Sequence, residues 1–216
     1  MALFIISAPS GSGKSTLVTE LFQRVPGLSF SISYTTRAPR GSEQDGREYF
    51  FVDRARFESM LAAGAFLEHA EVFGNYYGTA WSFLREAEGR GQDLVLDIDV
   101  QGAAQVKRRL PDAVAIFIAP PDRATLERRL RNRGLDAPAV VEKRLADASR
   151  EIAAYNGYEY LVINDRLEES VEELTAIVRC HRGADAGVCA RAATCRLPGA
   201  AARLVQVLRS FGLEEA

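Results

Sequence analysis

The chain contains few of the residues on which several kinds of protein depend. It has only two histidines, which argues against a Ser-His-Asp or Cys-His catalytic arrangement. No apolar run approaches the length of a transmembrane span, so no membrane partner is expected. The formal net charge is only −2, so no global electric field would draw the chain to nucleic acid.

Cysteine is also scarce. There are three, Cys180, Cys189 and Cys195, all near the C-terminus. An odd number predicts free thiols rather than a disulfide framework, and their spacing matches no familiar zinc pattern. The N-terminal residues lack the basic leader of a signal peptide. Together these features predict a cytoplasmic protein.

What the chain does contain fits a globular α/β protein. Hydrophobic residues make up 47% of the 216 positions and charged residues 26%, which is typical of folded soluble domains. Continuous apolar strands are expected at 3–6, 93–99, 113–118 and 160–163, with helices between them. This alternation predicts a parallel core sheet that is covered by helices on both faces.

Two regions break this alternation. Residues 33–80 contain short strands with antiparallel character and are interpreted as an inserted subdomain, after a strand at 28–33. Residues 182–196 are mostly Gly, Ala, Arg and Cys, and one last amphipathic helix is expected at 204–211. The tail from residue 181 onward is therefore predicted to be only partly helical.

Residues 8–16 form the most informative motif. They follow a short apolar strand and open an amphipathic helix, which is the context of a phosphate-binding loop. Glycines allow backbone amides to point at an anion, the helix N-terminus attracts negative charge, and a lysine can reach the terminal phosphates. A glycine-rich surface loop is the alternative. The motif predicts a nucleoside triphosphate site made of Ala8, Pro9, Ser10, Gly11, Ser12, Gly13, Lys14, Ser15 and Thr16.

Two carboxylates follow an apolar run. Asp97 and Asp99 lie at the end of the strand expected at 93–99, with side chains on one face. The carboxyl ends of parallel strands face the ligand crevice, so one acid would suit a Mg²⁺-bound water and the other a second substrate. The alternative is that they cap the next helix, and the two interpretations are compatible for one of the residues.

A second anion site is indicated in residues 33–40. Arg37 and Arg40, together with Tyr49, have the donors to hold another phosphate group, because the arginine fork matches phosphate oxygens. A solvated basic turn is the alternative. Arg129 and Arg133 share a face of a basic helix, which would suit the charge that develops in phosphoryl transfer. That helix could also be a merely solvated one.

Glu68 stands among apolar residues of a strand expected at 65–73. A buried carboxylate needs donors, and the N1–H and N2–H₂ edge of guanine supplies two. Adenine would present an acceptor at N1 instead. Hydroxyls such as those of Ser33 and Thr79 could donate to guanine O6. This set predicts a guanine pocket.

With these residues assembled, the chain resembles guanylate kinases of the bacterial type from about residue 3 to residue 179. The resemblance is carried in order by SAPSGSGKST, SYTTRAPRGSEQDGREYFFV, FLEHAEVFGNYYGT, LDIDVQG, FIAPP, RRLRNRG and VIND. It implies a three-layer P-loop nucleoside-monophosphate kinase fold with a parallel core sheet, an inserted GMP-binding subdomain and a helical lid. The implied domain spans 1–180, with core 1–32, 81–120 and 156–180, insert 33–80 and lid 121–155, followed by the tail 181–216.

The resemblance also implies a reaction, in which MgATP and GMP give ADP and GDP. The implied catalytic residues are Lys14, Arg129, Arg133 and Arg144, and Asn164 would contact adenine. Ser15 and Asp97 would lie near Mg²⁺. The implied GMP-binding residues are Ser33, Arg37, Arg40, Tyr49, Glu68, Tyr77, Thr79 and Asp99.

Two other functions are weighed. The chain could resemble the inactive guanylate-kinase-like binding modules of scaffold proteins, but those lack a working phosphate loop, whereas Lys14 and Ser15 are present here. It could also phosphorylate another monophosphate, against which the guanine-complementary set at Glu68 argues. The tail after Arg179 departs from the charged C-terminal helix expected of the family, which leaves a homo-oligomer open.

Overall fold

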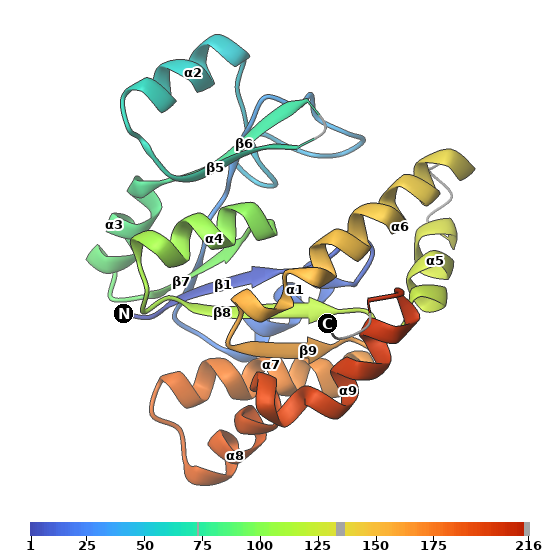
Figure 1. The fold of residues 1–216 in the computed structure, drawn as a ribbon. Coiled ribbons are helices and arrows are strands. Elements are labelled where there is room, and N and C mark those ends of the chain that lie inside the picture. Colours follow the sequence, from blue (N-terminus) through green and yellow to red (C-terminus); the bar gives the residue numbers. More distant parts are fainter. Residues whose placement is uncertain (73, 133–136, 214–216) are drawn as a thin grey trace. The chain divides into compact units, whose positions relative to one another are not determined.

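The computed structural model describes residues 1–72, 74–132 and 137–213 (Figure 1). These residues form two compact units, which are described separately below. The first contains Met1–Ile5 and Gly27–Ala113, and the second contains Ile6–Pro26 and Val114–Ala216. The strand β1 (Leu3–Ser7), which is fully buried, passes from one unit into the other.

A sheet of five strands has the order β2-β7-β1-β8-β9. In the first unit, β2 (Leu28–Phe30) pairs in parallel with β7 (Asp93–Asp97), with Leu28 opposite Asp93. In the second unit, β8 (Val114–Ala119) pairs in parallel with β9 (Tyr160–Ile163), with Ile116 opposite Tyr160. Apolar residues dominate these strands, as expected for strands buried on both faces. The predicted α/β class with a parallel core sheet is confirmed.

The first unit has a second sheet, of four strands in the order β4-β3-β6-β5. The edge strands are β4 (Phe50–Phe51) and β5 (Phe66–Val72), and the inner ones are β3 (Tyr34–Thr35) and β6 (Asn75–Ala80). Strand β6 runs antiparallel to both of its neighbours. Phe57, Phe66 and Ala80 form the centre of a small separate core. This core shows why residues 33–80 depart from the parallel pattern.

Three helices belong to the first unit. They are α2 (Arg54–Ala62), α3 (Trp81–Gly89) and α4 (Val100–Arg109). The Asp53 carboxylate caps α2 by accepting from the amide of Arg56 at 2.7 Å. Two sequence-based boundaries were wrong. The strand expected at 28–33 ends at Phe30, because the chain leaves to enter the second sheet, and the strand expected at 93–99 ends at Asp97.

The second unit carries the remaining helices and a short 3₁₀ turn at Tyr155–Gly157. Helix α7 contacts α1, α8 and β9, while α9 contacts α5, α8 and β9 (Figure 1). The helices are α1 (Lys14–Arg24), α5 (Arg123–Asn132), α6 (Pro138–Ala153), α7 (Leu167–His181), α8 (Ala186–Thr194) and α9 (Leu197–Ser210).

The tail is more regular than its composition suggests. Helix α8 was not predicted, because its small residues give little periodic signal, and α9 begins seven residues before the helix expected at 204–211. The Asp185 carboxylate caps α8 by accepting from the amides of Gly187 and Val188 at 2.9 and 3.1 Å. Most of the tail is therefore helical.

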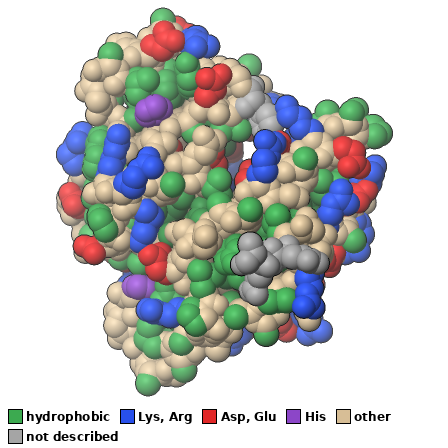
Figure 2. All heavy atoms as spheres, viewed as in Figure 1, with side chains coloured by type: hydrophobic (Ala, Val, Ile, Leu, Met, Phe, Trp, Pro, Cys, Tyr) green, Lys and Arg blue, Asp and Glu red, His purple; other side chains and the backbone are tan. Residues whose placement is uncertain are grey.

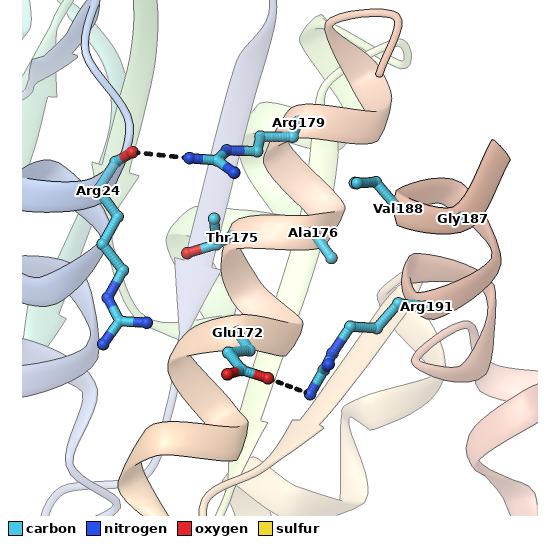
Figure 3. A pocket seen from close by; sticks show the side chains of 8 residues that line it. All are labelled: Arg24, Glu172, Thr175, Ala176, Arg179, Gly187, Val188 and Arg191. Atoms are coloured by element: carbon cyan, nitrogen blue, oxygen red, sulfur yellow. Dashed lines mark hydrogen bonds and ion pairs between the residues drawn. The ribbon is translucent and has the colours of Figure 1, made fainter. Parts of the chain in front are cut away.

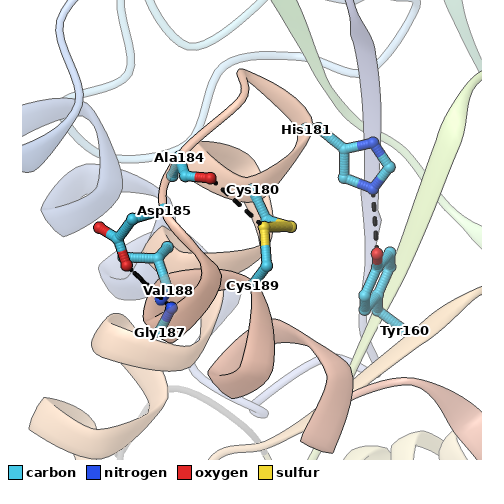
Figure 4. Close-up of a disulfide and its surroundings, with 8 residues drawn as sticks. All are labelled: Tyr160, Cys180, His181, Ala184, Asp185, Gly187, Val188 and Cys189. Atoms are coloured by element: carbon cyan, nitrogen blue, oxygen red, sulfur yellow. Dashed lines mark hydrogen bonds between the residues drawn. A yellow bond between two sulfur atoms is a disulfide. The ribbon is translucent and has the colours of Figure 1, made fainter.

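The expectation of free thiols was wrong for two of the three cysteines. Cys180, at the end of α7, forms a disulfide with Cys189 of α8 (Figure 4). The turn between the two helices, which includes Gly183 at φ 80°, brings the two Cα atoms within 4.9 Å. Cys195 keeps a free thiol that is fully buried, and burial raises its pKa to about 11.

The surface is mixed in charge. Figure 2 shows basic and acidic side chains interspersed on the viewed face, in keeping with the small net charge. In the described part of the chain, no helix combines the length and the apolar character that a membrane crossing requires.

Candidate nucleotide sites

The predicted phosphate loop has the expected backbone. It follows β1 and leads into α1, which begins at Lys14. Gly11 and Gly13 adopt φ values of 94° and 89°, a region that residues with a side chain rarely occupy. The amide of Ser12 donates to the carbonyl of Pro9 at 3.0 Å and closes the turn. The loop thus curls immediately before a helix N-terminus, which is the arrangement that binds phosphate.

Neighbouring side chains pack tightly on these two glycines. A Cβ atom on Gly11 would lie 2.9 Å from Leu130 Cδ2 and 3.0 Å from Leu126 Cδ1, both on α5. A Cβ atom on Gly13 would lie 2.3 Å from Asn164 Nδ2. The glycines are therefore required by this packing as well as by the backbone angles.

Asn164 braces the phosphate loop. It follows β9, is 5% exposed, and donates from Nδ2 to the carbonyl of Ser12 at 2.7 Å. The backbone carbonyl of Asn164 accepts from Arg129 Nη2 at 2.9 Å. The side-chain amide is thus engaged with the loop, and the adenine contact implied for it stays a prediction. Sequence analysis did not anticipate this bracing role, because residues 12 and 164 are far apart in the chain.

Two buried donors near this network have no hydrogen-bond partner within the described part of the chain. They are Arg129 Nη1 and Ser12 Oγ. Burial lowers the pKa of the Arg129 guanidinium, which nevertheless remains a cation, because arginine is not deprotonated in proteins. A buried, unpaired donor is destabilising unless a ligand satisfies it. The residues of the phosphate loop and α5 therefore fit an anionic ligand such as a polyphosphate.

The residues assigned to Mg²⁺ lie in separate units. Ser15 is exposed in the first turn of α1, and Asp97 is half-buried at the end of β7. The carboxylate and hydroxyl oxygens at these positions are donors of the type that Mg²⁺ prefers. Throughout residues 1–72, 74–132 and 137–213, no cluster of three His, Cys, Asp or Glu residues suits a metal. The joint role of Ser15 and Asp97 stays a prediction.

The remaining basic residues of the implied lid are only partly described. Arg133 lies outside the described residues. Arg144 is half-buried on α6. Arg131 pairs with Glu127 at 2.7 Å, one turn earlier on α5, as a solvated helix face would predict for that residue. Arg129 differs from it, because its guanidinium is turned into the unit.

Glu68 is the central residue of the second predicted site, in the first unit. It lies on β5 with 3% exposure and stands opposite Thr79 of β6. Burial raises the pKa of its carboxyl to about 7, and the negative charge of Asp99 adds to the rise. Hydrogen bonds from Thr79 and the positive charge of Arg109 act in the opposite direction and lower this pKa. A nearly buried carboxylate that is only partly stabilised suits a ligand with two donors.

Helix α4 positions Glu68. A Cβ atom on Gly102, in the first turn of α4, would lie 2.5 Å from Glu68 Oε2. Strand β5 lies at the edge of its sheet, and side chains of α4 bond to its backbone. Gln105 Nε2 donates to the carbonyl of His69 at 2.6 Å. Arg109 Nη1 donates to the carbonyl of Phe66 at 2.9 Å. Sequence analysis missed Gly102, Gln105 and Arg109, because only the fold brings them to residue 68.

Other predicted guanine-pocket residues gather around Glu68 in the same unit. The hydroxyls of Ser33 and Thr79 lie 3.3 Å apart. Asp99 lies just beyond β7 and caps α4, because its Oδ1 accepts from the amide of Gly102 at 2.8 Å. The capping alternative therefore holds for Asp99, and the expectation that it continues the strand alongside Asp97 was wrong. Its second carboxylate oxygen accepts a long, 3.5 Å bond from Gln101.

The predicted phosphate-holding residues form a second group. Arg37 forms an ion pair with Glu43 at 2.9 Å and stacks over the Tyr49 ring at 5.3 Å from its centroid. The pKa of Arg37 is raised, chiefly by the hydrogen bond to Glu43, and Tyr77 also contributes. The Tyr49 and Tyr77 rings meet edge to face at 5.9 Å. The side chain of Arg40 is exposed.

A cavity of about 660 Å³ lies apart from the predicted site residues, between α1, α7 and α8 (Figure 3). Two of its three arginines are paired with carboxylates, Arg24 with Glu168 at 2.9 Å and Arg191 with Glu172 at 2.6 Å. Arg179 donates to the carbonyl of Arg24 at 3.1 Å. This cavity belongs to the junction of the tail with α1. Its lining is Arg24, Glu172, Thr175, Ala176, Arg179, Gly187, Val188 and Arg191.

Comparison with known proteins gives one family for this chain. The family model described as guanylate kinase matches residues 1–181. Guanylate kinase of Koribacter versatilis is 64% identical over 183 residues, covering 83% of this chain and 78% of that protein. Guanylate kinase of Alkalilimnicola ehrlichii is 48% identical over 180 residues, covering 83% and 89%.

A solved structure leads to the same family. The crystal structure of guanylate kinase from Anaplasma phagocytophilum superposes with a TM-score of 0.67 at 32% sequence identity. That match covers 83% of this chain and 85% of the other. The fold is thus the P-loop nucleoside-monophosphate kinase fold that the sequence predicted, and the chain belongs to the guanylate kinase family.

Proposed function

We propose that this chain transfers a phosphoryl group from ATP, bound at residues 8–16, to GMP, bound around Glu68. Membership of the guanylate kinase family makes the chain an ATP:GMP phosphotransferase. The single observation that carries the choice of GMP is the buried Glu68 carboxyl, whose pKa is raised to about 7. It lies opposite Thr79, whose hydroxyl is 3.3 Å from that of Ser33.

The proposed roles follow from the chemistry of the groups. Ionised Glu68 would accept from guanine N1–H and N2–H₂, a pairing that adenine cannot offer. The GMP phosphate would be held by Arg37, Arg40, Tyr49 and Tyr77. To bind it, Arg37 would give up its ion pair with Glu43. Asp99 would contact the guanine through the carboxylate oxygen that does not cap α4.

On the ATP side, the amides of residues 11–14 would surround the phosphates and Lys14 would stabilise the group in transfer. Arg129 would add its buried Nη1 donor to the same charge, and Arg133 and Arg144 are proposed to act with it. Mg²⁺, held near Ser15 and Asp97, would neutralise phosphate charge. Asn164 is proposed to contact adenine through its remaining amide oxygen while its Nδ2 holds Ser12.

Location and assembly are further proposals. We place the protein in the cytoplasm, as the scarcity of cysteine in the sequence predicts. The Cys180–Cys189 disulfide does not support that location, since disulfides are rare in reducing compartments. A homo-oligomer is the corresponding proposal for assembly, and sedimentation of the purified chain would test it.

ADP release in a coupled assay tests the function across GMP, AMP, CMP, UMP and dTMP. We expect turnover with GMP to exceed turnover with the others by orders of magnitude. Lys14→Ala should nearly abolish turnover and leave GMP binding intact, because its charge acts on the transferring group. A faster reaction with another monophosphate would refute the guanine assignment. GMP binding without turnover by the unsubstituted chain would favour the binding-module alternative.

A further inference from the structure

The last helix of the chain lies beyond the family match, which ends at residue 181. Helix α9 is nonetheless firmly packed. Its residues Leu204, Val207 and Leu208 are at most 6% exposed, and Phe211 just after it is 8% exposed. It contacts β9 and α5 in the same unit. The helix is therefore an integral part of this unit rather than a loose appendage.

Ser210, the last residue of α9, is bonded to the first turn of α5. Its hydroxyl oxygen accepts from the amide of Arg123 at 3.1 Å and donates its own hydrogen to the carbonyl of Val207 at 2.8 Å. The amide of Arg123 is one of the helix-start donors that have no partner inside the helix. Asp122 accepts from another of them, the amide of Thr125, at 2.6 Å. The tail thus completes the N-terminal cap of α5.

Helix α5 lies directly on the phosphate loop. Leu126 and Leu130 pack on Gly11 so closely that a Cβ atom there would meet them at 3.0 and 2.9 Å. Arg129, between them, reaches the carbonyl of Asn164, whose side chain holds the carbonyl of Ser12. Any displacement of α5 would therefore be transmitted to the loop through both apolar and polar contacts.

We infer that Ser210 is a positioning residue: through the amide of Arg123 it fixes α5, and through α5 it fixes the loop proposed to bind ATP. The inference rests on the proposed function only for the identity of that ligand. It assigns the tail a part in nucleotide binding, although the tail lies outside the segment that the family model matches.

Ser210→Ala tests this inference in the full chain. We expect the KM for ATP to rise about fivefold, the factor that corresponds to the loss of one helix cap, while the KM for GMP stays unchanged. Backbone amides of α5 should exchange hydrogen for deuterium faster than in the unsubstituted chain. Ser210→Thr, which retains the hydroxyl, should restore both values. A general loss of stability would instead lower the active fraction and leave both KM values unchanged.

Thr194→Ala is the matched control. The hydroxyl of Thr194 donates to the carbonyl of Arg191 at 2.7 Å near the end of α8, the same bond to the third preceding residue that Ser210 makes. We expect this variant to leave the KM for ATP and the exchange of α5 unchanged. Equal values for Ser210→Ala and Thr194→Ala in both measurements would overturn the inference.

The exchange measurement needs no turnover, so the two proposals fail separately. If the unsubstituted chain shows no GMP-dependent ADP release, the proposed function fails, while faster exchange in α5 of Ser210→Ala would still support the positioning role. If the chain is active and α5 exchanges at the same rate with and without the Ser210 hydroxyl, only the positioning role fails.

Discussion

The carboxylate of Glu68 fills the space that a side chain at residue 102 would need. A Cβ atom on Gly102 would lie only 2.5 Å from Glu68 Oε2 and 3.1 Å from its Cδ. Both residues belong to the first unit, where β5 carries the acid and α4 carries the glycine. The absence of a side chain at the start of α4 thus permits a carboxylate to lie against that helix.

Gly102→Ala should therefore impair GMP binding more than folding. The added methyl would force Glu68 out of place, and we expect the KM for GMP to rise on the order of tenfold. Alanine is favoured over glycine inside a helix by up to about 1 kcal/mol, which offsets part of the packing strain in the free energy of unfolding. Steady-state kinetics and thermal melting of the same preparation separate the two effects.

Gly89→Ala on α3 is the control for that substitution. A Cβ atom on Gly89 would meet nothing within 4 Å. This variant should match the unsubstituted chain in KM for GMP. An unchanged KM in Gly102→Ala as well would mean that Glu68 is not part of the guanine pocket.

The raised pKa of Glu68 predicts a pH dependence of GMP binding. In the free protein the pKa is about 7, above its ordinary value of 4.5, so much of the carboxyl is protonated at pH 6. A protonated carboxyl cannot accept from both guanine donors. The KM for GMP should therefore fall as pH rises from 6 to 8. The GMP phosphate also titrates in this range, since its second pKa is near 6. The pH dependence of the KM for GMP in Glu68→Gln measures this contribution of the phosphate, because the variant has no carboxyl at residue 68.

The same pKa sets the sign of a stability effect without ligand. Between pH 4.5 and 7 the folded chain retains a proton on Glu68 that the unfolded chain has lost, so this residue destabilises the fold increasingly as pH rises. Denaturant unfolding should show a decline across this range that is smaller in Glu68→Gln. A steeper decline in Glu68→Gln would contradict the assigned direction.

Sequence patterns were sufficient for the features that depend on neighbours in the chain. The glycine turn before α1, the apolar strands of the core and the cap at Asp53 are all local, and each was predicted. The apolar surroundings of Glu68 could also be read from strand alternation.

Features that depend on the fold could not be read in this way. Asn164 meets Ser12 across 152 residues, and Gly102 is needed only because β5 and α4 are packed together. Helix α8 gives little periodic signal, because it consists mainly of small residues, and its disulfide depends on a turn that the sequence did not reveal. The proposed roles of Arg133 and Arg144 stay predictions.

Arg129→Ala should lower kcat on the order of a hundredfold or more. The Nη1 donor of Arg129 is buried and lacks a partner within the described residues, whereas Nη2 is bonded to the carbonyl of Asn164. A donor held in place before the reaction stabilises charge in the transition state more than one that must be ordered. Single-turnover kinetics with saturating ATP and GMP would measure the effect.

Arg128→Ala, on the same helix, provides the comparison. Arg128 is exposed and makes a long, 3.4 Å bond to Thr125 Oγ1. We expect its kcat to stay within about twofold of the unsubstituted value, as for most surface substitutions. Equal kcat values for the two alanine variants would remove Arg129 from the catalytic group.

Reduction of the Cys180–Cys189 disulfide should lower stability and spare catalysis. The bridge closes a short loop, with a sequence separation of 9, for which loop-closure entropy gives about 2–3 kcal/mol. For a chain of this size that corresponds to a fall of about 5–10 °C in Tm. Because the bridge joins α7 to α8, neither of which carries a predicted site residue, kcat should not change. Melting curves with and without a thiol reductant measure the effect. A Cys180→Ser/Cys189→Ser variant should have the Tm of the reduced chain, and the reductant should not change it. If mass spectrometry showed full reduction without any change in Tm, the disulfide would have no part in holding α8 to α7.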